Sequence, residues 1–162
     1  MGSVVEGLSG DGNVVLGTSS STTFNIAAAL WLNGDLFELG LALPASANSA
    51  EQSIYGASTD GSVLAGFSSD GFRDVAYVWR DGELASPIGS PLSANGCLET
   101  NANCVANAVS GDGGLIVGTS QLGASDARAF VYSGLSSEMF ALGDLTGAGT
   151  DLARKSGLTG GN

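Results

Sequence analysis

The segment Ser110-Gly111-Asp112-Gly113-Gly114-Leu115-Ile116-Val117-Gly118 decides the fold, because a tight turn leads there into a short apolar run that ends in glycine. The same arrangement occurs at residues 9–17 and 58–66, and all three copies read Ser-x-Asp-Gly-x, then three apolar residues, then Gly. An Asp-Gly pair is a strong hairpin signal, since glycine tolerates the positive φ of a primed turn. We therefore predict three structural turns, at Asp11 and Gly12, Asp60 and Gly61, and Asp112 and Gly113.

The three copies belong to a longer repeat. The turn aspartates lie 49 and 52 positions apart, and an aromatic residue follows each of them after 20, 19 and 20 positions. These aromatics, Trp31, Trp79 and Tyr132, each end a short apolar run. A second turn signal comes directly afterwards, most clearly at Asn33-Gly34. Each unit is thus predicted to contain four short strands joined as two hairpins.

A period near 50 residues with four strands per unit is typical of propeller blades or of a stacked β array. We expect an all-β fold of three tandem four-stranded antiparallel units, at residues 4–49, 50–104 and 105–145. The Gly-rich tail at 146–162 is expected to be flexible or to pair with another strand. Pro87 should place its strand at a sheet edge, because proline cannot donate a ladder hydrogen bond.

The third strand of each unit is apolar without alternation, and such a strand is buried on both faces. Stacking of neighbouring units would bury strands in this way. We therefore expect Trp31, Trp79 and Tyr132 to be core aromatics packed between units.

Composition narrows the classes of function. Of the 162 residues, 43% are hydrophobic, 13% are charged and 26 are glycine, and the formal net charge is −11. An acidic surface repels phosphate backbones, so no nucleic-acid partner is expected. No apolar run approaches the roughly 18 residues of a membrane span. Histidine, the usual general base and commonest metal ligand, does not occur.

The two cysteines, Cys97 and Cys104, lie seven positions apart among polar residues. A local disulfide is predicted, because free cysteines tend to be buried. Such a bond would indicate an oxidising compartment. Two free thiols are the alternative.

The repeat resembles the bacterial extracellular HAF repeat family, whose units combine a Val-Ser-x-Asp-Gly turn, an apolar-Gly strand, an Ala-Phe-x-Trp strand and a Leu-Gly end. Here these parts are found at residues 109–113, 116–118, 129–132 and 142–145. Departures are Tyr132 in place of tryptophan, Pro87, and a long second connection. The resemblance implies propeller-like blades in a secreted or surface-exposed protein, often an autotransporter passenger region, with an adhesive or structural role rather than catalysis.

No catalytic, cofactor or metal site is predicted. The three turn aspartates could bind calcium, but we favour carboxylates that accept N–H bonds within their own turns. With Lys155 as the sole lysine, serine or cysteine catalysis lacks a base. Phe24 and Phe72 could stack on sugars, which keeps a carbohydrate-binding module as the alternative function.

Closed propellers typically need at least four blades. Three units would leave two unpaired faces, so we expect self-association into a ring or an open filament. A surface protein or a glycan is a further possible partner. The alternative is that the chain forms part of a larger propeller or passenger domain.

Overall fold

The computed structural model of the chain describes residues 2–20, 26–39, 51–69, 71, 73–81, 83, 86–88, 102–122 and 126–142. These residues form strands and turns, and no helix with the length and hydropathy of a membrane span occurs among them. The predicted tail at 146–162, Cys97, Phe24 and Phe72 lie outside the described residues.

The strands form three four-stranded antiparallel sheets, each made by consecutive strands in chain order. The all-β prediction of three tandem four-stranded units is therefore confirmed. Unit 1 consists of β1 (Ser3–Leu8), β2 (Val14–Ser19), β3 (Ala27–Leu32) and β4 (Asp35–Glu38). Unit 2 consists of β5 (Glu51–Ala57), β6 (Val63–Ser69), β7 (Asp74–Arg80) and β8 (Ser86–Pro87). Unit 3 consists of β9 (Ala102–Val109), β10 (Leu115–Leu122), β11 (Asp126–Ser133) and β12 (Glu138–Ala141).

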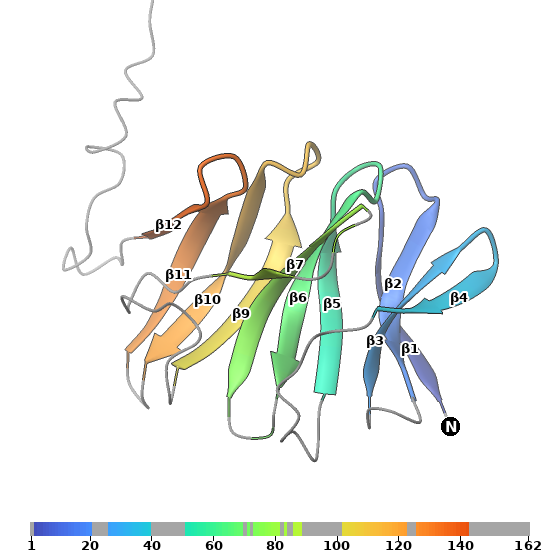
Figure 1. Cartoon of the computed structure of the whole chain (residues 1–162), viewed down its shortest axis with the longest axis horizontal. Coiled ribbons are helices and arrows are strands. Elements are labelled where there is room, and N and C mark those ends of the chain that lie inside the picture. Colours follow the sequence, from blue (N-terminus) through green and yellow to red (C-terminus); the bar gives the residue numbers. More distant parts are fainter. Residues whose placement is uncertain are drawn as a thin grey trace, which may run out of the picture.

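The three sheets stack face to face like blades, with unit 2 between units 1 and 3 (Figure 1). The first strand of each unit provides most of the contact with the unit before it: β5 packs on β1, β2 and β3, and β9 packs on β5, β6 and β7. The short fourth strands lie at the opposite edges. Pro87 lies in β8, at the edge of sheet β5-β6-β7-β8, where its missing N–H costs no ladder bond.

The second strand of each unit continues past the glycine that ends the sequence motif: β2 runs on to Ser19, β6 to Ser69 and β10 to Leu122. This differs from the expected strand end, and the pairing explains why. The first strand of each unit carries a bulge opposite the glycine. A carbonyl oxygen of that strand occupies the place where a Cβ would stand, so only glycine fits. The three glycines are Gly17, Gly66 and Gly118, and they face the carbonyls of Val4, Ser53 and Val105.

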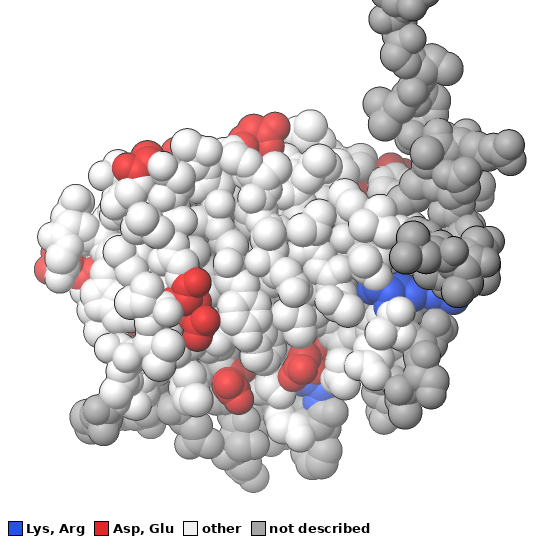
Figure 2. All heavy atoms as spheres, turned by 180° about the vertical axis from the view of Figure 1, so that it is seen from behind, with Lys and Arg blue, Asp and Glu red and all other residues white. Residues whose placement is uncertain are grey.

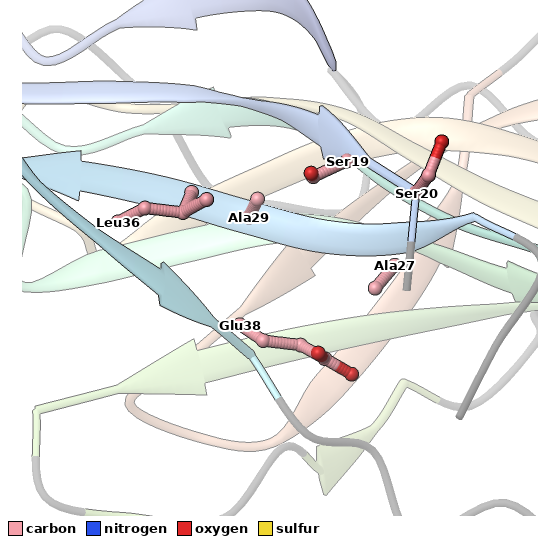
Figure 3. Close-up of a pocket in the computed structure, with 6 residues that line it drawn as sticks. All are labelled: Ser19, Ser20, Ala27, Ala29, Leu36 and Glu38. Atoms are coloured by element: carbon pink, nitrogen blue, oxygen red, sulfur yellow. The ribbon is translucent and has the colours of Figure 1, made fainter. Parts of the chain in front are cut away.

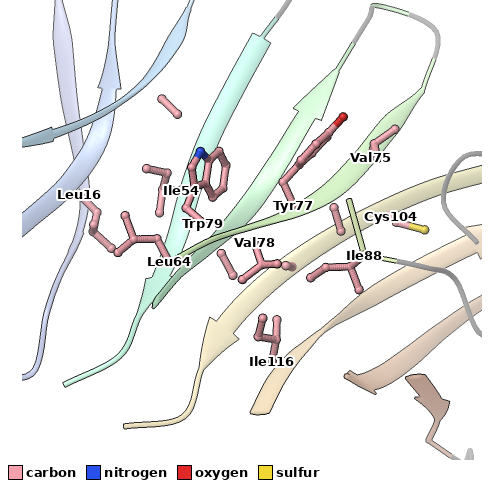
Figure 4. Packing of buried hydrophobic residues seen from close by; sticks show 14 of the residues in the cluster. Leu16, Ile54, Leu64, Val75, Tyr77, Val78, Trp79, Ile88, Cys104 and Ile116 are labelled. Carbon is pink, nitrogen blue, oxygen red and sulfur yellow. The ribbon is translucent and has the colours of Figure 1, made fainter. Parts of the chain in front are cut away.

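The hydrophobic core lies between the sheets rather than within any one of them. Leu16 of unit 1, Ile54 of unit 2 and Ile116 of unit 3 are fully buried members of a single cluster (Figure 4). No unit could bury its apolar faces alone, which is the reason that such repeats stack.

The first strand of unit 3 begins at Ala102, slightly before the boundary expected from the sequence. Cys104 therefore lies within β9 and is fully buried, with its Sγ 3.4 Å from the Oγ of Ser120. Cys104 is thus part of a strand, although its neighbours in the sequence are polar. Since Cys97 is outside the described residues, its pairing with Cys104 stays a prediction.

Candidate functional site

The three Ser-x-Asp-Gly turns have the same internal hydrogen bonds. In the first turn, the hydroxyl of Ser9 donates to Oδ1 of Asp11 at 2.7 Å, and the N–H of Asn13 donates to the same oxygen at 3.0 Å. The N–H of Val14 in turn donates to Oγ of Ser9 at 3.0 Å. The turns at Asp60 and Asp112 repeat these three bonds with the corresponding residues. The carboxylates thus close their own turns, which is the interpretation that the sequence favoured.

These hydrogen bonds stabilise the charged form of each carboxylate. The Ser58 hydroxyl and the Ser62 N–H lower the pKa of Asp60 to about 2. The pKa of Asp112 is lowered by the Ser110 hydroxyl and by a backbone N–H, and that of Asp11 is lowered chiefly by the backbone N–H of Asn13. Among the residues that the structure describes, no group of three or more His, Cys, Asp or Glu side chains could hold a metal ion.

The glycine of each Asp-Gly pair has φ near +75°, with values of +79°, +73° and +72° for Gly12, Gly61 and Gly113. The last two also face the preceding unit. A Cβ at Gly61 would stand 2.5 Å from Cγ2 of Val14, and one at Gly113 would stand 2.6 Å from Cγ2 of Val63. A Cβ at Gly12 would have no neighbour within 4 Å. The space above Gly12 is therefore open, whereas a valine of the preceding unit fills the equivalent space above Gly61 and Gly113.

The turns are also joined to one another through their backbones. The N–H of Asp11 donates to the carbonyl of Thr59 at 2.8 Å, and the N–H of Thr59 donates to the carbonyl of Gly111 at 2.8 Å. Gly10 and Gly111, on either side of Thr59, leave room for its side chain. The turns thus form a ladder that runs across one end of the stack in a fixed direction.

Unit 1 exposes a row of apolar side chains on the face turned away from unit 2. The row crosses all four strands, because its members are cross-strand partners. We call it the outer face of unit 1, and its members are Leu8, Val15, Trp31 and Leu36. Leu36 is 53% exposed, Leu8 is likewise exposed, and Val15 and Trp31 are half-buried.

The equivalent row of unit 2 packs against unit 1. It contains Leu64 and Trp79, which are cross-strand partners like Val15 and Trp31. Both are buried, and Trp79 lines a hollow together with Leu30 and Leu39 of unit 1. In unit 3 the row includes Ile116 and Tyr132, and Ile116 is fully buried. The outer face of unit 1 is therefore an inter-unit surface without its neighbour.

The core aromatics follow from this arrangement. Trp31, Trp79 and Tyr132 occupy the same position in their sheets, opposite Val15, Leu64 and Ile116. Trp79 is buried and Tyr132 packs against the core. Trp31 is only half-buried, which differs from the prediction that all three are packed between units. The reason is that the described chain places no unit before unit 1.

Unit 3 has an open face of the opposite kind, turned away from unit 2. We call it the outer face of unit 3, and its members are Ala108, Val117, Val131 and Phe140. Its central Val117 is 39% exposed, whereas the equivalent Leu16 of unit 1 is 1% exposed because unit 2 covers it. The stack therefore ends in two different apolar surfaces, and the central residues of the equivalent rows, such as Leu16 and Leu64, are covered at the interfaces between units.

Two small hollows occur among the described residues. One opens on the outer face of unit 1, where Ala29, Leu36 and Glu38 line about 80 Å³ together with two serines (Figure 3). The other lies between units 1 and 2 and has a volume of about 160 Å³. Pockets for organic ligands usually measure about 300–1,000 Å³. These two hollows are therefore too small for a typical substrate.

None of the eight members of the two apolar rows is charged, and Glu38 lies beside Leu36 at the edge of the outer face of unit 1. Acidic side chains lie in separate places on the surface seen from behind, with wide uncharged areas between them (Figure 2). In a chain of net charge −11, such uncharged rows are suited to contact with another protein surface.

Sequence reasoning found the turns and the aromatics but missed the outer face of unit 3. Its members are ordinary apolar residues without a motif of their own, and the only signal was their place in the repeat relative to Leu16 and Leu30. The sequence also gave no sign of the turn ladder, because backbone atoms form it.

The sequence matches no family model and no curated protein. Similarity appears among solved structures. A protein assigned as TolB from Agrobacterium tumefaciens matches with a TM-score of 0.59 at 16% identity, over 85% of this chain and 45% of that chain. TolB from Acinetobacter baumannii matches with a TM-score of 0.55 at 15% identity, over 83% of this chain and 31% of that chain. Both are propeller structures, and the chain spans less than half of the length of either. The likeness identifies the three units as propeller-like blades.

Proposed function

We propose that this chain is a non-enzymatic, propeller-like interaction module, which serves a structural or adhesive role outside the cytoplasm through association at its open blade faces. The observation that carries the proposal is the outer face of unit 1, where Leu8, Val15, Trp31 and Leu36 form an uncovered apolar row. The same row is buried in unit 2, so the surface has the chemistry and the shape of an interface.

Several features support a role without catalysis. The described hollows are small, the chain has no histidine, and the turn aspartates are engaged in their own turns. An extracellular or cell-surface location is supported by the resemblance to HAF repeats and by the predicted disulfide between Cys97 and Cys104. The net charge of −11 disfavours nucleic acid as a partner, so a protein surface or a glycan is the expected partner.

The test is the mass of the protein in solution. Light scattering after size exclusion should give a mass above that of the 16.0 kDa monomer at micromolar concentration, and the mass should rise with concentration. A charged substitution at an exposed member of the row, Leu36→Lys, should lower that mass. The matched control is Leu135→Lys, because Leu135 is 95% exposed in the β11–β12 turn and belongs to neither outer face. A compact monomer at every concentration would contradict the proposal.

A further inference from the structure

We infer that the outer face of unit 1 is covered by the outer face of unit 3 from a second copy of this chain, in the register that units 1, 2 and 3 already use among themselves. The inference rests on the proposed function, that of an association module, and adds the identity of the partner surface and its orientation.

The chain itself shows how these two kinds of face fit. At both internal interfaces, the first three strands of one unit present the positions equivalent to Ala108, Val117 and Val131. The next unit packs against them, and its facing row contains the positions equivalent to Val15 and Trp31. The fourth-strand position is less covered, since Phe37, the equivalent of Phe140, is 47% exposed. The stack leaves one face of each kind open, and the two are complementary rather than alike. A second copy therefore offers the partner surface that each open face lacks, in a head-to-tail contact.

One side chain fixes the register. Val14 of unit 1 and Val63 of unit 2 each lie over the turn glycine of the next unit, Gly61 and Gly113. The equivalent residue of unit 3 is Leu115, which is exposed, and the glycine with open space above it is Gly12. We expect Leu115 of one copy to lie over Gly12 of the next.

The backbone ladder continues in the same register. Within the chain, each turn donates an N–H to a carbonyl of the following turn. At the junction, an N–H of the turn at Gly111 would donate to the carbonyl of Gly10 in the next copy. Both positions are glycine, so no side chain keeps the two turns apart.

Ala108 sets the spacing of the junction. The equivalent residues of units 1 and 2 are Gly7 and Gly56. A Cβ at Gly56 would stand 2.8 Å from Cα of Ala108, whereas a Cβ at Gly7 would have Tyr55 O as its nearest atom of unit 2, at 3.8 Å. The methyl group of Ala108 therefore fits if the two copies are as far apart as units 1 and 2. It would clash if the copies were as close together as units 2 and 3.

A mixing experiment tests the inference. Leu36→Lys closes the outer face of unit 1, and Val117→Lys closes that of unit 3. Each variant alone should be monomeric, because a head-to-tail contact needs one face of each kind. An equimolar mixture should form a one-to-one complex in sedimentation velocity, since the intact unit 3 of the first variant can dock on the intact unit 1 of the second. Circular dichroism must show that both variants keep the β fold.

A second pair of variants tests the register. Gly12→Asn keeps a residue that tolerates positive φ but fills the space expected for Leu115. We expect it to weaken self-association by at least about tenfold. The control is Gly34→Asn, because Gly34 has φ of +91° and equally open space in the β3–β4 turn. Gly34→Asn should associate like the wild type.

The outcomes separate this inference from the proposed function. If the wild type associates, one lysine variant still pairs with itself and the other is monomeric, the contact joins two like faces and the inference is overturned, while the association module stands. If the wild type is monomeric at all concentrations, both fail, and the open faces belong to another occupant, such as a further part of the polypeptide. A ring and a filament both support the inference, since both are built from the same contact.

Discussion

Trp79 and Trp31 offer a comparison in which the same substitution is made at the same place of two units with different neighbours. Trp79 is 4% exposed, because it lies between unit 2 and unit 1. Trp31 has its own sheet on one side and an open face on the other. We predict that Trp79→Ala lowers the free energy of unfolding far more than Trp31→Ala does when the protein is dilute.

The magnitudes follow from the buried area. A tryptophan side chain buries roughly 150–250 Å², which at about 25 cal/mol per Å² corresponds to about 4–6 kcal/mol. The methyl group kept by alanine reduces this cost, and so does the removal of the buried Nε1, which has no hydrogen-bond partner. We expect a loss of about 3–5 kcal/mol for Trp79→Ala. Trp31 is covered on one side only, so its loss should be about 2 kcal/mol.

The assay is urea unfolding followed by far-ultraviolet circular dichroism at several protein concentrations. Trp79→Phe is the control: it keeps most of the packing and removes the unbonded N–H, so it should cost about 1 kcal/mol or less. The cost of Trp31→Ala should grow with protein concentration, because docking of a second copy covers Trp31. Equal costs for the two alanine variants in dilute solution would refute the position of Trp79 between units 1 and 2 and of Trp31 on an open face.

Three further predictions concern the glycines, a buried amide and the turns. Gly66→Ala should destabilise the protein by at least about 2 kcal/mol, because a Cβ there meets the carbonyl of Ser53; Gly2→Ala, with open space, should change thermal stability by less than about 0.5 kcal/mol. Gln52 is 0% exposed and neither polar atom of its amide has a partner, so Gln52→Met should raise the free energy of unfolding by about 1–3 kcal/mol; a loss would mean that the amide is satisfied. The pKa of Asp60 is about 2 in the fold against an ordinary value of 3.8, so its carboxylate stabilises the fold above pH 3.8 and loses this effect as the pH falls towards 2. Asp60→Asn should therefore reduce the fall in the free energy of unfolding between pH 3.8 and pH 2. The same fall in the variant as in the wild type would show that this turn does not contribute to the loss of stability in acid.

Much of the architecture was predictable from the sequence, since the Ser-x-Asp-Gly turns and the aromatics that follow them occur at a regular spacing. The number of strands per unit and the edge position of Pro87 followed from turn chemistry and from the missing N–H of proline. The strand ends were not predictable. In the sequence, Gly66 indicates the end of a strand, whereas in the fold the strand continues past it and the glycine makes room for a bulge in the neighbouring strand.

The candidate interface was only partly predictable. Two open faces were expected from a count of three units, but their composition depends on which side of each sheet faces the next unit. Nothing in a stretch such as Leu115-Ile116-Val117 indicates that Ile116 is covered and Val117 is open. That assignment needs the register between strands and the order of the units in space.

The central claim, that unit 1 presents an inter-unit surface that a second copy covers, is tested most directly by the solvent access of the two tryptophans. The chain has only these two, so Trp31→Phe and Trp79→Phe each leave one as a reporter. Acrylamide quenching should find Trp79 shielded at every concentration. Trp31 should be accessible near 1 µM and become shielded towards about 100 µM as copies dock. Equal and concentration-independent quenching of the two residues would contradict the claim.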